Sequence, residues 1–562
     1  MTAAGGGLLR QAPRLTLLLV TGPVLAGVAG TVAPAFGLGE RPGLEAFRAL
    51  AGWPGLGAAV RLSATTGLVS TVLALGLTLL ILALLPGSRA FRAILRLLSP
   101  LLSVPHAAVA LGLAFLIAPS GWIARALSPW ATGWTEPPDL LMLNDPWGLA
   151  LVAGLVAKEV PFLLLMSLAA LPQTDAARRT VLAASLGYGR MTGWVFGVLP
   201  SLYRQIRLPV YAVLAYSMTA VEMAMILGPT RPPTLSVQVA LWMADPALAE
   251  RGRAAAAALL QLGLVAAALA GWRAAEVAAR RLLVAGAEAG LRGARLDALL
   301  RPLALGGAGL VVAAVGLGLG GLALWSVAGL WSFPDALPSA FSLRTWAAAA
   351  PDLAGRTVLT LGIAAATAGI ALALALACLE AEARHGLRPS PAAMAALYLP
   401  LIVPQVAFLP GLQVAALGLG LDGSAVAVAA VHLVFVLPYV FLSLSAPYRA
   451  WDGRIATAAA TLGATPGRIF WRLRLPMLLR PVLTALAVGA AVSVGQYLPT
   501  LLIGGGRVAT LTTEAVALAS GGNRRIVGTY ALLQMVLPAA GFALALMLPA
   551  LAFRHRRGMA AA

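Results

Sequence analysis

The chain has 562 residues, of which 60% are hydrophobic and only 11% are charged, and its mean hydropathy is +0.90. An ordinary soluble domain carries about 25% charged residues, so this composition excludes a chain built from water-soluble domains. The formal charge of +20 does not require a nucleic-acid partner, because Lys and Arg concentrate in the cytoplasmic loops of membrane proteins.

Apolar runs of about 20 residues, the length that crosses a lipid bilayer, recur along the chain. We expect an all-α membrane protein with about twelve transmembrane helices in two six-helix halves, residues 1–272 and 301–562, joined by a cytoplasmic linker at 273–300. The predicted spans of the first half are 15–36, 60–85, 99–118, 147–170, 206–228 and 254–272. Those of the second half are 302–329, 356–380, 393–416, 425–446, 482–503 and 528–553.

Most of the 40 Lys and Arg residues fall in segments on one side of this scheme, which places both termini in the cytoplasm. The run at 15–36 is too long for the apolar core of a usual signal peptide, so we expect a retained first helix. The single cysteine, Cys378, excludes an intrachain disulfide. Lys158 is the only lysine and lies in no phosphate-binding loop, so nucleotide energy must come from another subunit.

Two basic loops, at about 177–209 and 449–481, interrupt the apolar runs after the fourth span of each half. A glycine in the left-handed conformation commonly ends a helix, and a proline cannot continue one, so we expect each loop to form a short helix closed by a Leu-Pro turn. Such a helix would stand as a compact knob on the cytoplasmic face. The two copies have the same internal spacing, offset by 276 residues: Gly187 with Leu199-Pro200, and Gly463 with Leu475-Pro476.

The repeat extends beyond these loops. PLLSVPH at 100–106 matches PLIVPQ at 400–405, and ALLQLGL at 258–264 matches ALLQMVL at 531–537. Because the copies occupy corresponding positions of two even-numbered bundles, they share one orientation in the membrane. This pattern predicts a parallel repeat with a passage at the interface between the halves.

At these loops the chain resembles the permease subunits of bacterial binding-protein-dependent ABC importers, of the methionine-importer-like transmembrane family. The family signature is Glu-Ala-Ala, a glycine at a set distance, and then Ile-x-Leu-Pro. Neither copy here keeps the glutamate, because Val181-Leu182-Ala183 and Thr457-Ala458-Ala459 stand at that position. The resemblance covers both halves, and in its double length the chain is similar to fused permeases of the iron and thiamine type and related putative importers.

The resemblance implies that the two knobs couple the membrane helices to separate ATPase subunits. Without the glutamate, we expect coupling to depend on the shape of the knobs and on Arg190, Arg454 and Arg468, which can pair with acidic residues of a groove. Ordinary basic loops shaped by topology alone would not explain the matched intervals. The implied ATPase-coupling residues are Ala183, Ala184, Gly187, Arg190, Leu199, Pro200, Thr457, Ala458, Ala459, Gly463, Arg468, Leu475 and Pro476.

Ionisable side chains within the apolar spans cost about 2.5 to 3.5 kcal/mol each on insertion scales, so each suggests a function. Lys158, Glu159 and Glu222 are such residues, and we expect them to line a passage beside Gln496 and Tyr497. Adjacent helix positions point about 100° apart, so Lys158 cannot pair well with Glu159 but could reach Glu222 across helices. The alternative is a structural ion pair or a water-filled crevice.

No metal site is expected, because His106 and His432 have no second ligand at a suitable spacing. Gln261 and Gln534 recur in both halves and are expected to form hydrogen bonds between helices. The sequence contains no hydrolase, metalloprotease or phosphate-cradling motif, so we do not expect an enzyme. No cofactor is expected on this chain, and ATP and Mg would bind to the partner ATPase.

The resemblance implies a complex in the bacterial cytoplasmic (inner) membrane, with one copy of this fused chain, two copies of a cytoplasmic ABC ATPase and a periplasmic solute-binding protein. An alternative from another class is an ion- or proton-driven secondary transporter of about twelve helices. The loop after the second span lacks the acidic element typical of such carriers. A membrane-embedded enzyme is a third alternative. The sequence leaves thiamine-like compounds, ferric iron, polyamines and oxyanions open as solutes.

Overall fold

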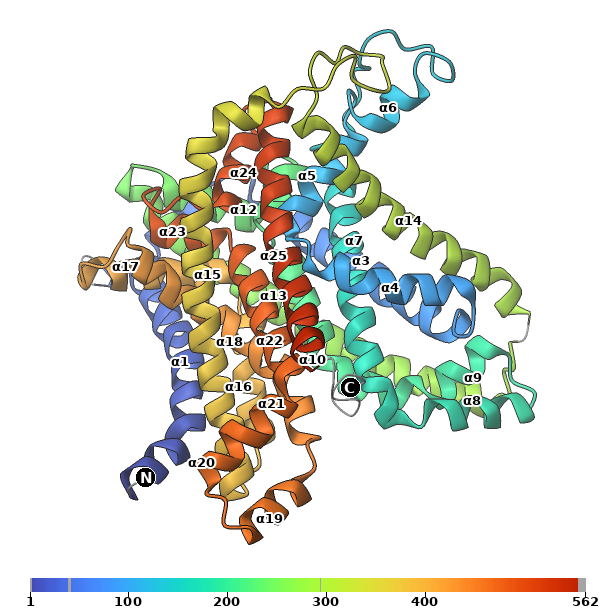
Figure 1. Ribbon diagram of the computed structural model, residues 1–562. Helices are drawn as coiled ribbons and strands as arrows, with labels where there is room; N and C mark the ends of the chain where they lie inside the picture. Colours follow the sequence, from blue (N-terminus) through green and yellow to red (C-terminus); the bar gives the residue numbers. More distant parts are fainter. Residues whose placement is uncertain (1–2, 39–41, 294, 554–562) are drawn as a thin grey trace.

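The computed structural model describes residues 3–38, 42–293 and 295–553, and these residues fold into helices joined by loops (Figure 1). Within the described part, the one β pairing is an isolated antiparallel bridge between Ala328 and Phe341. The prediction of an all-α membrane protein is confirmed. The last residues, 554–562, on which the predicted cytoplasmic C-terminus depends, lie outside the described part.

The first half begins at α1 and ends with the long helix α13, with a 3-10 turn at Leu171–Thr174 after α7. Its helices are α1 (Ala3–Ala35), α2 (Glu45–Ala51), α3 (Leu56–Leu84), α4 (Arg89–Ser103), α5 (His106–Ile117), α6 (Trp122–Leu127), α7 (Leu149–Ala170), α8 (Ala176–Ser185), α9 (Arg190–Gly197), α10 (Leu199–Thr219), α11 (Glu222–Leu227), α12 (Leu235–Ala244) and α13 (Leu248–Glu288).

The second half follows the same order with small differences, among them a π-helical turn at Phe470–Arg474. Its helices are α14 (Leu296–Ser326), α15 (Arg344–His385), α16 (Pro391–Ile402), α17 (Gln405–Gly418), α18 (Ala425–Arg449), α19 (Gly453–Thr461), α20 (Pro466–Ile469), α21 (Leu475–Met477), α22 (Leu479–Val494), α23 (Leu498–Gly504), α24 (Leu511–Ala519) and α25 (Arg524–Ala552).

Nine helices of the described part are long and apolar enough to cross a membrane, or ten if the pair Pro466–Met477 and Leu479–Val494, bent by 76°, counts as one span. The sequence predicted about twelve. The other two predicted spans, 206–228 and 393–416, are each divided into two helices, α10 with α11 and α16 with α17. Val403 is extended (ψ 126°) because the following proline disfavours the helical conformation of the residue before it.

The same kind of break recurs in the first half. Val104, also extended before a proline, separates α4 from α5, so the third span begins at His106 and not at residue 99. Most of the predicted linker, 273–300, is helical, because α13 continues without interruption to Glu288. The chain therefore leaves the first half inside one long helix, and only a short segment precedes α14 at Leu296.

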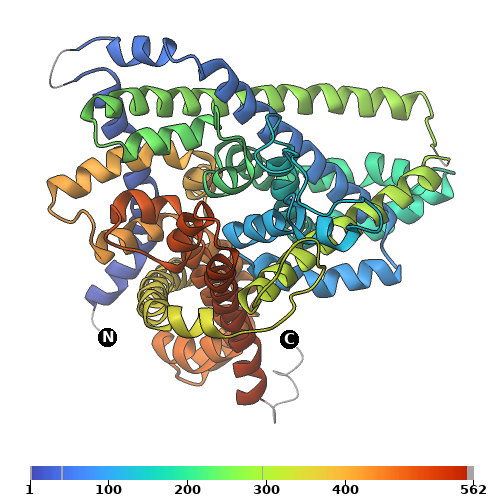
Figure 2. The same ribbon diagram turned by 90° about the horizontal axis from the view of Figure 1, so that it is seen from above.

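The first helix of each half packs on the other half. Helix α1 lies against α15, α16, α17 and α18, and α14 lies against α3 and α5. Figure 2 shows α1 beside the orange helices of the second half and α14 beside the blue and cyan helices of the first. This reciprocal crossing joins the two halves along their length.

Both crossings occur where two glycines meet. A Cβ added to Gly411 of α17 would lie 1.9 Å from the carbonyl oxygen of Gly27 in α1. A Cβ on Gly112 of α5 would lie 2.9 Å from the carbonyl carbon of Gly318 in α14. Small residues allow helix backbones to approach closely in membranes, where van der Waals packing is a main source of helix association.

Hydrogen bonds within the halves follow the repeat. The Leu235 N–H donates to the Ser63 hydroxyl at 2.9 Å, and the Leu511 N–H donates to the Thr360 hydroxyl at 3.1 Å. The predicted interhelical hydrogen bonds of the two glutamines are confirmed: Gln261 donates to the Met218 carbonyl at 3.1 Å, and Gln534 donates to the Thr512 hydroxyl at 2.8 Å.

We predict that Gly411→Ala destabilises the protein by about 1 to 3 kcal/mol, the usual cost of overpacking, because the added methyl group collides with the α1 backbone. The measurement is the thermal unfolding midpoint of the purified chain in detergent. Gly362→Ala in α15 is the matched control, because its Cβ meets no atom within 4 Å and alanine favours helix over glycine. Equal midpoints for the two variants would contradict the close approach.

Candidate functional site

The two predicted knobs are formed by α8 with α9 and by α19 with α20, and both lie at the lower end of the molecule in Figure 1. The first helix of each knob, α8 or α19, ends in the same way. The glycine after it has a left-handed backbone, with φ +79° at Gly187 and +81° at Gly463. Equivalent N–H groups return to equivalent carbonyls: Gly187 to Ala184 at 3.0 Å, Gly463 to Ala460 at 2.9 Å, Tyr188 to Ala183 at 3.1 Å, and Ala464 to Ala459 at 3.0 Å.

These two pairs of bonds form a Schellman-type cap, which satisfies the last carbonyls of a helix and turns the chain sharply. A side chain at either glycine would strain the left-handed backbone. The predicted Leu-Pro turn differs in the structure, because Leu199-Pro200 begins α10 and Leu475-Pro476 begins α21. Proline is tolerated in the first turn of a helix, where its missing N–H would have no helical partner.

No residue of α8 or α19, both fully described, is buried. Each knob carries an exposed leucine directly before its glycine, Leu186 at 56% and Leu462 at 88% exposed. The first knob also exposes Val181 and Leu182. Clustered exposed apolar side chains outside the membrane-spanning helices indicate a surface that a partner covers.

The other predicted coupling residues lie around these tips. The half-buried ones are Ala183, Leu199, Ala459, Leu475 and Pro476. The exposed ones are Ala184, Gly187, Arg190, Pro200, Thr457, Ala458, Gly463 and Arg468.

Two of the arginines expected to pair with a partner already have partners within the chain. The Arg190 guanidinium donates to the Pro86 carbonyl at 2.7 Å. Arg454 forms an ion pair with Asp452 at 2.7 Å, and its guanidinium and backbone N–H hold the pKa of the Asp452 carboxyl below the ordinary value. All three arginines, Arg190, Arg454 and Arg468, are nevertheless exposed on the knobs.

The first knob is fastened by a residue that the sequence analysis missed. The Asp297 carboxylate, in the first turn of α14, accepts the N–H groups of Arg190 at 2.6 Å and Met191 at 2.9 Å. These are free donors at the start of α9, the groups that a helix cap satisfies. In the second knob, Thr465 caps its own helix by accepting the Arg468 N–H at 3.4 Å. Position 465 corresponds to Gly189, which has no side chain to act as a cap.

The second knob is fastened by a buried ion network. Glu380 of α15 accepts hydrogen bonds from Arg384 at 2.6 Å and from Arg474 and Tyr448. Arg474 also stacks over the Trp451 ring at 4.5 Å, and Arg384 donates to the Pro466 carbonyl at 3.3 Å. The membrane helix α15 is thereby linked to the base of the knob.

Lys158 and Glu159 are both buried on α7. The Lys158 ammonium donates to the carbonyls of Leu101 at 3.4 Å and Val104 at 2.5 Å, near the end of α4. Carbonyls at the end of a helix lack helical partners, so the break before Pro105 creates this site for a cation. The suggested pair of Lys158 with Glu222 differs from the structure, in which Glu222 accepts the Tyr216 hydroxyl at 3.0 Å.

Four elements bring a polar cluster together: Glu159, His106, Tyr216 and Glu222. His106 Nε2 lies 3.9 Å from the Glu159 carboxylate, and the rings of His106 and Tyr216 are 4.8 Å apart. The His106 side chain is 33% exposed, whereas Glu159 and Glu222 are buried. The described residues contain no group of three or more His, Cys, Asp or Glu side chains placed to hold a metal ion.

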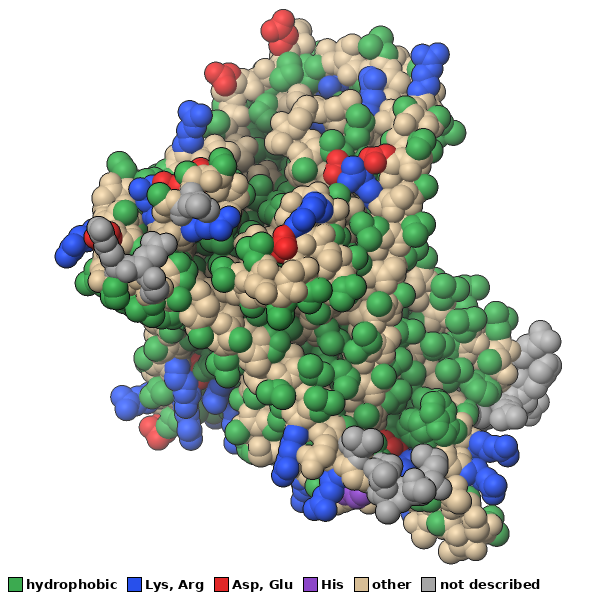
Figure 3. Space-filling model, turned by 90° about the vertical axis from the view of Figure 1, so that its left-hand side faces the viewer, with side chains coloured by type: hydrophobic (Ala, Val, Ile, Leu, Met, Phe, Trp, Pro, Cys, Tyr) green, Lys and Arg blue, Asp and Glu red, His purple; other side chains and the backbone are tan. Residues whose placement is uncertain are grey.

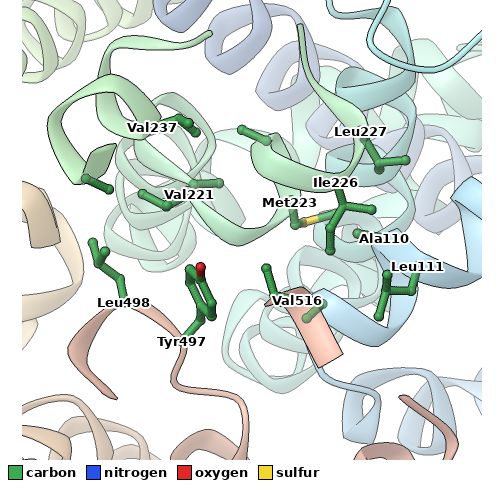
Figure 4. Close-up of a cluster of buried hydrophobic side chains, with 14 of the residues drawn as sticks. Ala110, Leu111, Val221, Met223, Ile226, Leu227, Val237, Tyr497, Leu498 and Val516 are labelled. Atoms are coloured by element: carbon green, nitrogen blue, oxygen red, sulfur yellow. The ribbon is translucent and has the colours of Figure 1, made fainter. Parts of the chain in front are cut away.

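An apolar plug closes the interface beside this cluster. Figure 4 shows Tyr497 and Leu498 of the second half pointing toward Val221 of the first, with Val516 near Met223. All five side chains are buried, and the Tyr497 hydroxyl lies 3.4 Å from the sulfur of Met225. Glu222 lies between Val221 and Met223 in the chain, so the plug and the polar cluster share α11. Gln496, half-buried, stands at the break between α22 and α23.

Comparison with known proteins decides the family. The chain is 32% identical over 534 residues to the inner membrane ABC transporter permease protein YnjC of Escherichia coli (strain K12), which covers 94% of this chain and 93% of the relative. The chain belongs to the ABC transporter permease family. It is therefore a multi-pass membrane transport subunit, not an enzyme, and it works with ATPase subunits.

A shorter stretch of this permease is similar to the molybdenum transport system permease proteins ModB of Mycobacterium bovis and Mycobacterium tuberculosis. Both are 32% identical over 151 residues, which is 25% of this chain and 55% of each relative. No family model matches the chain. Membership of the permease family favours ATP-driven transport over the secondary-transporter alternative.

We predict that Asp297→Ala loosens the start of α9. Losing a helix cap costs about 1 kcal/mol, so the amide hydrogens of Arg190 and Met191 should exchange about fivefold faster. Hydrogen–deuterium exchange on the full chain measures this effect. Thr465→Ala is the matched variant and should loosen the second knob alone. Unchanged exchange at 190–191 in Asp297→Ala would contradict the assigned role.

Proposed function

We propose that this permease is the membrane part of a binding-protein-dependent importer of the methionine-importer-like type, with its knobs and both termini in the cytoplasm. The observation that carries the proposal is the pair of identically capped, exposed knobs at one end of two halves that close a shared apolar plug. The ABC permease family requires an ATPase partner, and two knobs that end their first helix in the same glycine cap offer two docking sites. One fused chain therefore pairs with two ATPase subunits.

ATP and Mg bind in the ATPase subunits, and this chain supplies the moving parts. Each knob passes a displacement to a membrane helix through a charged tether. Asp297 joins the first knob, at α9, to α14 of the second half, whereas Arg474 and Arg384 join the second knob to Glu380 on α15 of its own half. Because α14 crosses the first half and α1 crosses the second, movement of either knob acts on both halves.

The plug is the barrier that this movement opens. Separating α11 and α12 from α23 and α24 would part Val221 from Tyr497 and uncover the polar cluster. Glu159, Tyr216 and Glu222 would then line the passage and offer hydrogen-bonding groups to a polar solute delivered by a periplasmic binding protein. In the closed form Tyr216 donates to Glu222, and His106 lies 3.9 Å from the Glu159 carboxylate.

Docking of the ATPase is tested by Leu186→Glu combined with Leu462→Glu. A carboxylate at each exposed tip would be buried without a partner in an apolar socket, so we expect the double variant to lose the ATPase subunits that co-purify with the full chain. The control is Leu343→Glu, at an equally exposed leucine (67%) just before α15 at the other end of the molecule. Co-purification that survives the double substitution would refute docking on the knobs.

Opening of the passage is tested by cysteine labelling, because Cys378 is the single cysteine and can be replaced by serine. In that background we introduce His106→Cys, and Ser520→Cys as an exposed control. Trapping the ATPase with nucleotide should change the rate at which a water-soluble thiol reagent labels position 106 severalfold and leave position 520 unchanged. Equal rates at position 106 in both nucleotide states would argue against the polar cluster as part of the passage.

A further inference from the structure

A cavity of about 720 Å³ lies at the knob end of the second half, between the start of α1, the end of α15 and the start of α16. It lies apart from the polar cluster and the plug, and no part of the coupling mechanism uses it. Its rim carries three guanidinium groups, those of Arg10, Arg14 and Arg388. All three residues are exposed, so their charges face water at the mouth of the cavity.

The acidic residue among the lining side chains, Glu382, is already engaged. Its carboxylate accepts two hydrogen bonds from Arg449, at 2.9 and 3.1 Å. The remaining charge of the cavity is positive. Arg10 and Arg14 are four residues apart on one helix, so their like charges lie on the same face and repel each other. An anion held between them would remove this repulsion.

The deeper wall of the cavity is apolar and is built by Leu17, Leu397 and Phe441. Beyond Arg14, α1 continues with exposed leucines, Leu18 at 65% and Leu25 at 62%. Figure 3 shows this side of the molecule, where a belt of mostly hydrophobic side chains separates charged groups above from a group of mostly Lys and Arg below. The basic rim is followed by an apolar wall and then by the apolar surface of α1. A phospholipid has the same order, with a charged headgroup followed by apolar acyl chains.

We propose that this cavity binds the phosphate headgroup of an anionic phospholipid of the cytoplasmic leaflet, with the acyl chains lying along α1. Guanidinium groups bind phosphate oxygens through paired, charge-assisted hydrogen bonds. Basic pockets between membrane helices on the cytoplasmic side suit anionic headgroups. Arg10 and Arg14 come from the first half and Arg388 from the second, so the lipid also ties α1 to the half that it crosses.

The test uses the full-length chain in detergent with mixed micelles of phosphatidylglycerol and phosphatidylcholine, and native mass spectrometry counts the lipids retained. We expect the variant Arg10→Gln/Arg14→Gln/Arg388→Gln to retain about tenfold less phosphatidylglycerol than the wild type, with no change for phosphatidylcholine. The control is Arg178→Gln/Arg280→Gln/Arg281→Gln. It removes the same charge from exposed arginines at the knob end of the first half and should retain phosphatidylglycerol normally.

Equal losses in the two triple variants would overturn the proposal, because they would indicate general attraction of anionic lipid to a basic surface. Displacement of the lipid by inorganic phosphate at the same concentration would also overturn it, in favour of a site for a free anion. If the pocket variant does not fold, Arg388→Gln replaces it. That single variant should lower retention relative to Arg281→Gln, and equal retention would overturn the proposal.

Discussion

The structure depends on two places where helix backbones touch at glycine. At Gly27 with Gly411, and at Gly112 with Gly318, the first helix of one half lies directly on a helix of the other. Lipid tails are as apolar as leucine, so helices in a membrane associate through close packing and not through escape from water. These contacts prevent the halves from moving apart as separate bodies. If the plug opens as proposed, a rotation or a bend of the halves around these crossings would separate α11 from α23 and keep the glycine contacts.

The first helices of the two knobs end in the same glycine cap, but different residues attach the two knobs to the membrane helices. Their glycine caps agree bond for bond, whereas the first is tied through Asp297 at the start of α14 and the second through the Glu380 network on α15. If the knobs dock two equal ATPase subunits, as proposed, the docking surface has to keep its shape in both copies, whereas the residues that attach each knob to the membrane helices can differ. The shared glycine caps and the different attachments, through Asp297 and Glu380, agree with this division.

The sequence predicted the class, the position of both knobs and their glycine caps, since these follow from hydropathy and from local spacing at Gly187 and Gly463. It did not predict that four of the spans, 99–118, 206–228, 393–416 and 482–503, are divided between two helices, because an apolar run has the same hydropathy whether its helix is continuous or broken. The role of Lys158 was missed for the same reason, because its acceptors appear only once α4 ends before Pro105. Asp297 and Glu380 act on residues about a hundred positions away, and no local pattern reveals such partners.

The placement of α1 has a consequence for how the protein is made. This helix is translated long before α15 to α18, the surfaces of the second half that receive it, because the rest of the first half lies between them in the chain. Until then α13 of the first half can contact α1, but Gly27 lacks its neighbour Gly411. The close glycine contact between the halves can therefore form only late in synthesis, after α17 has entered the membrane.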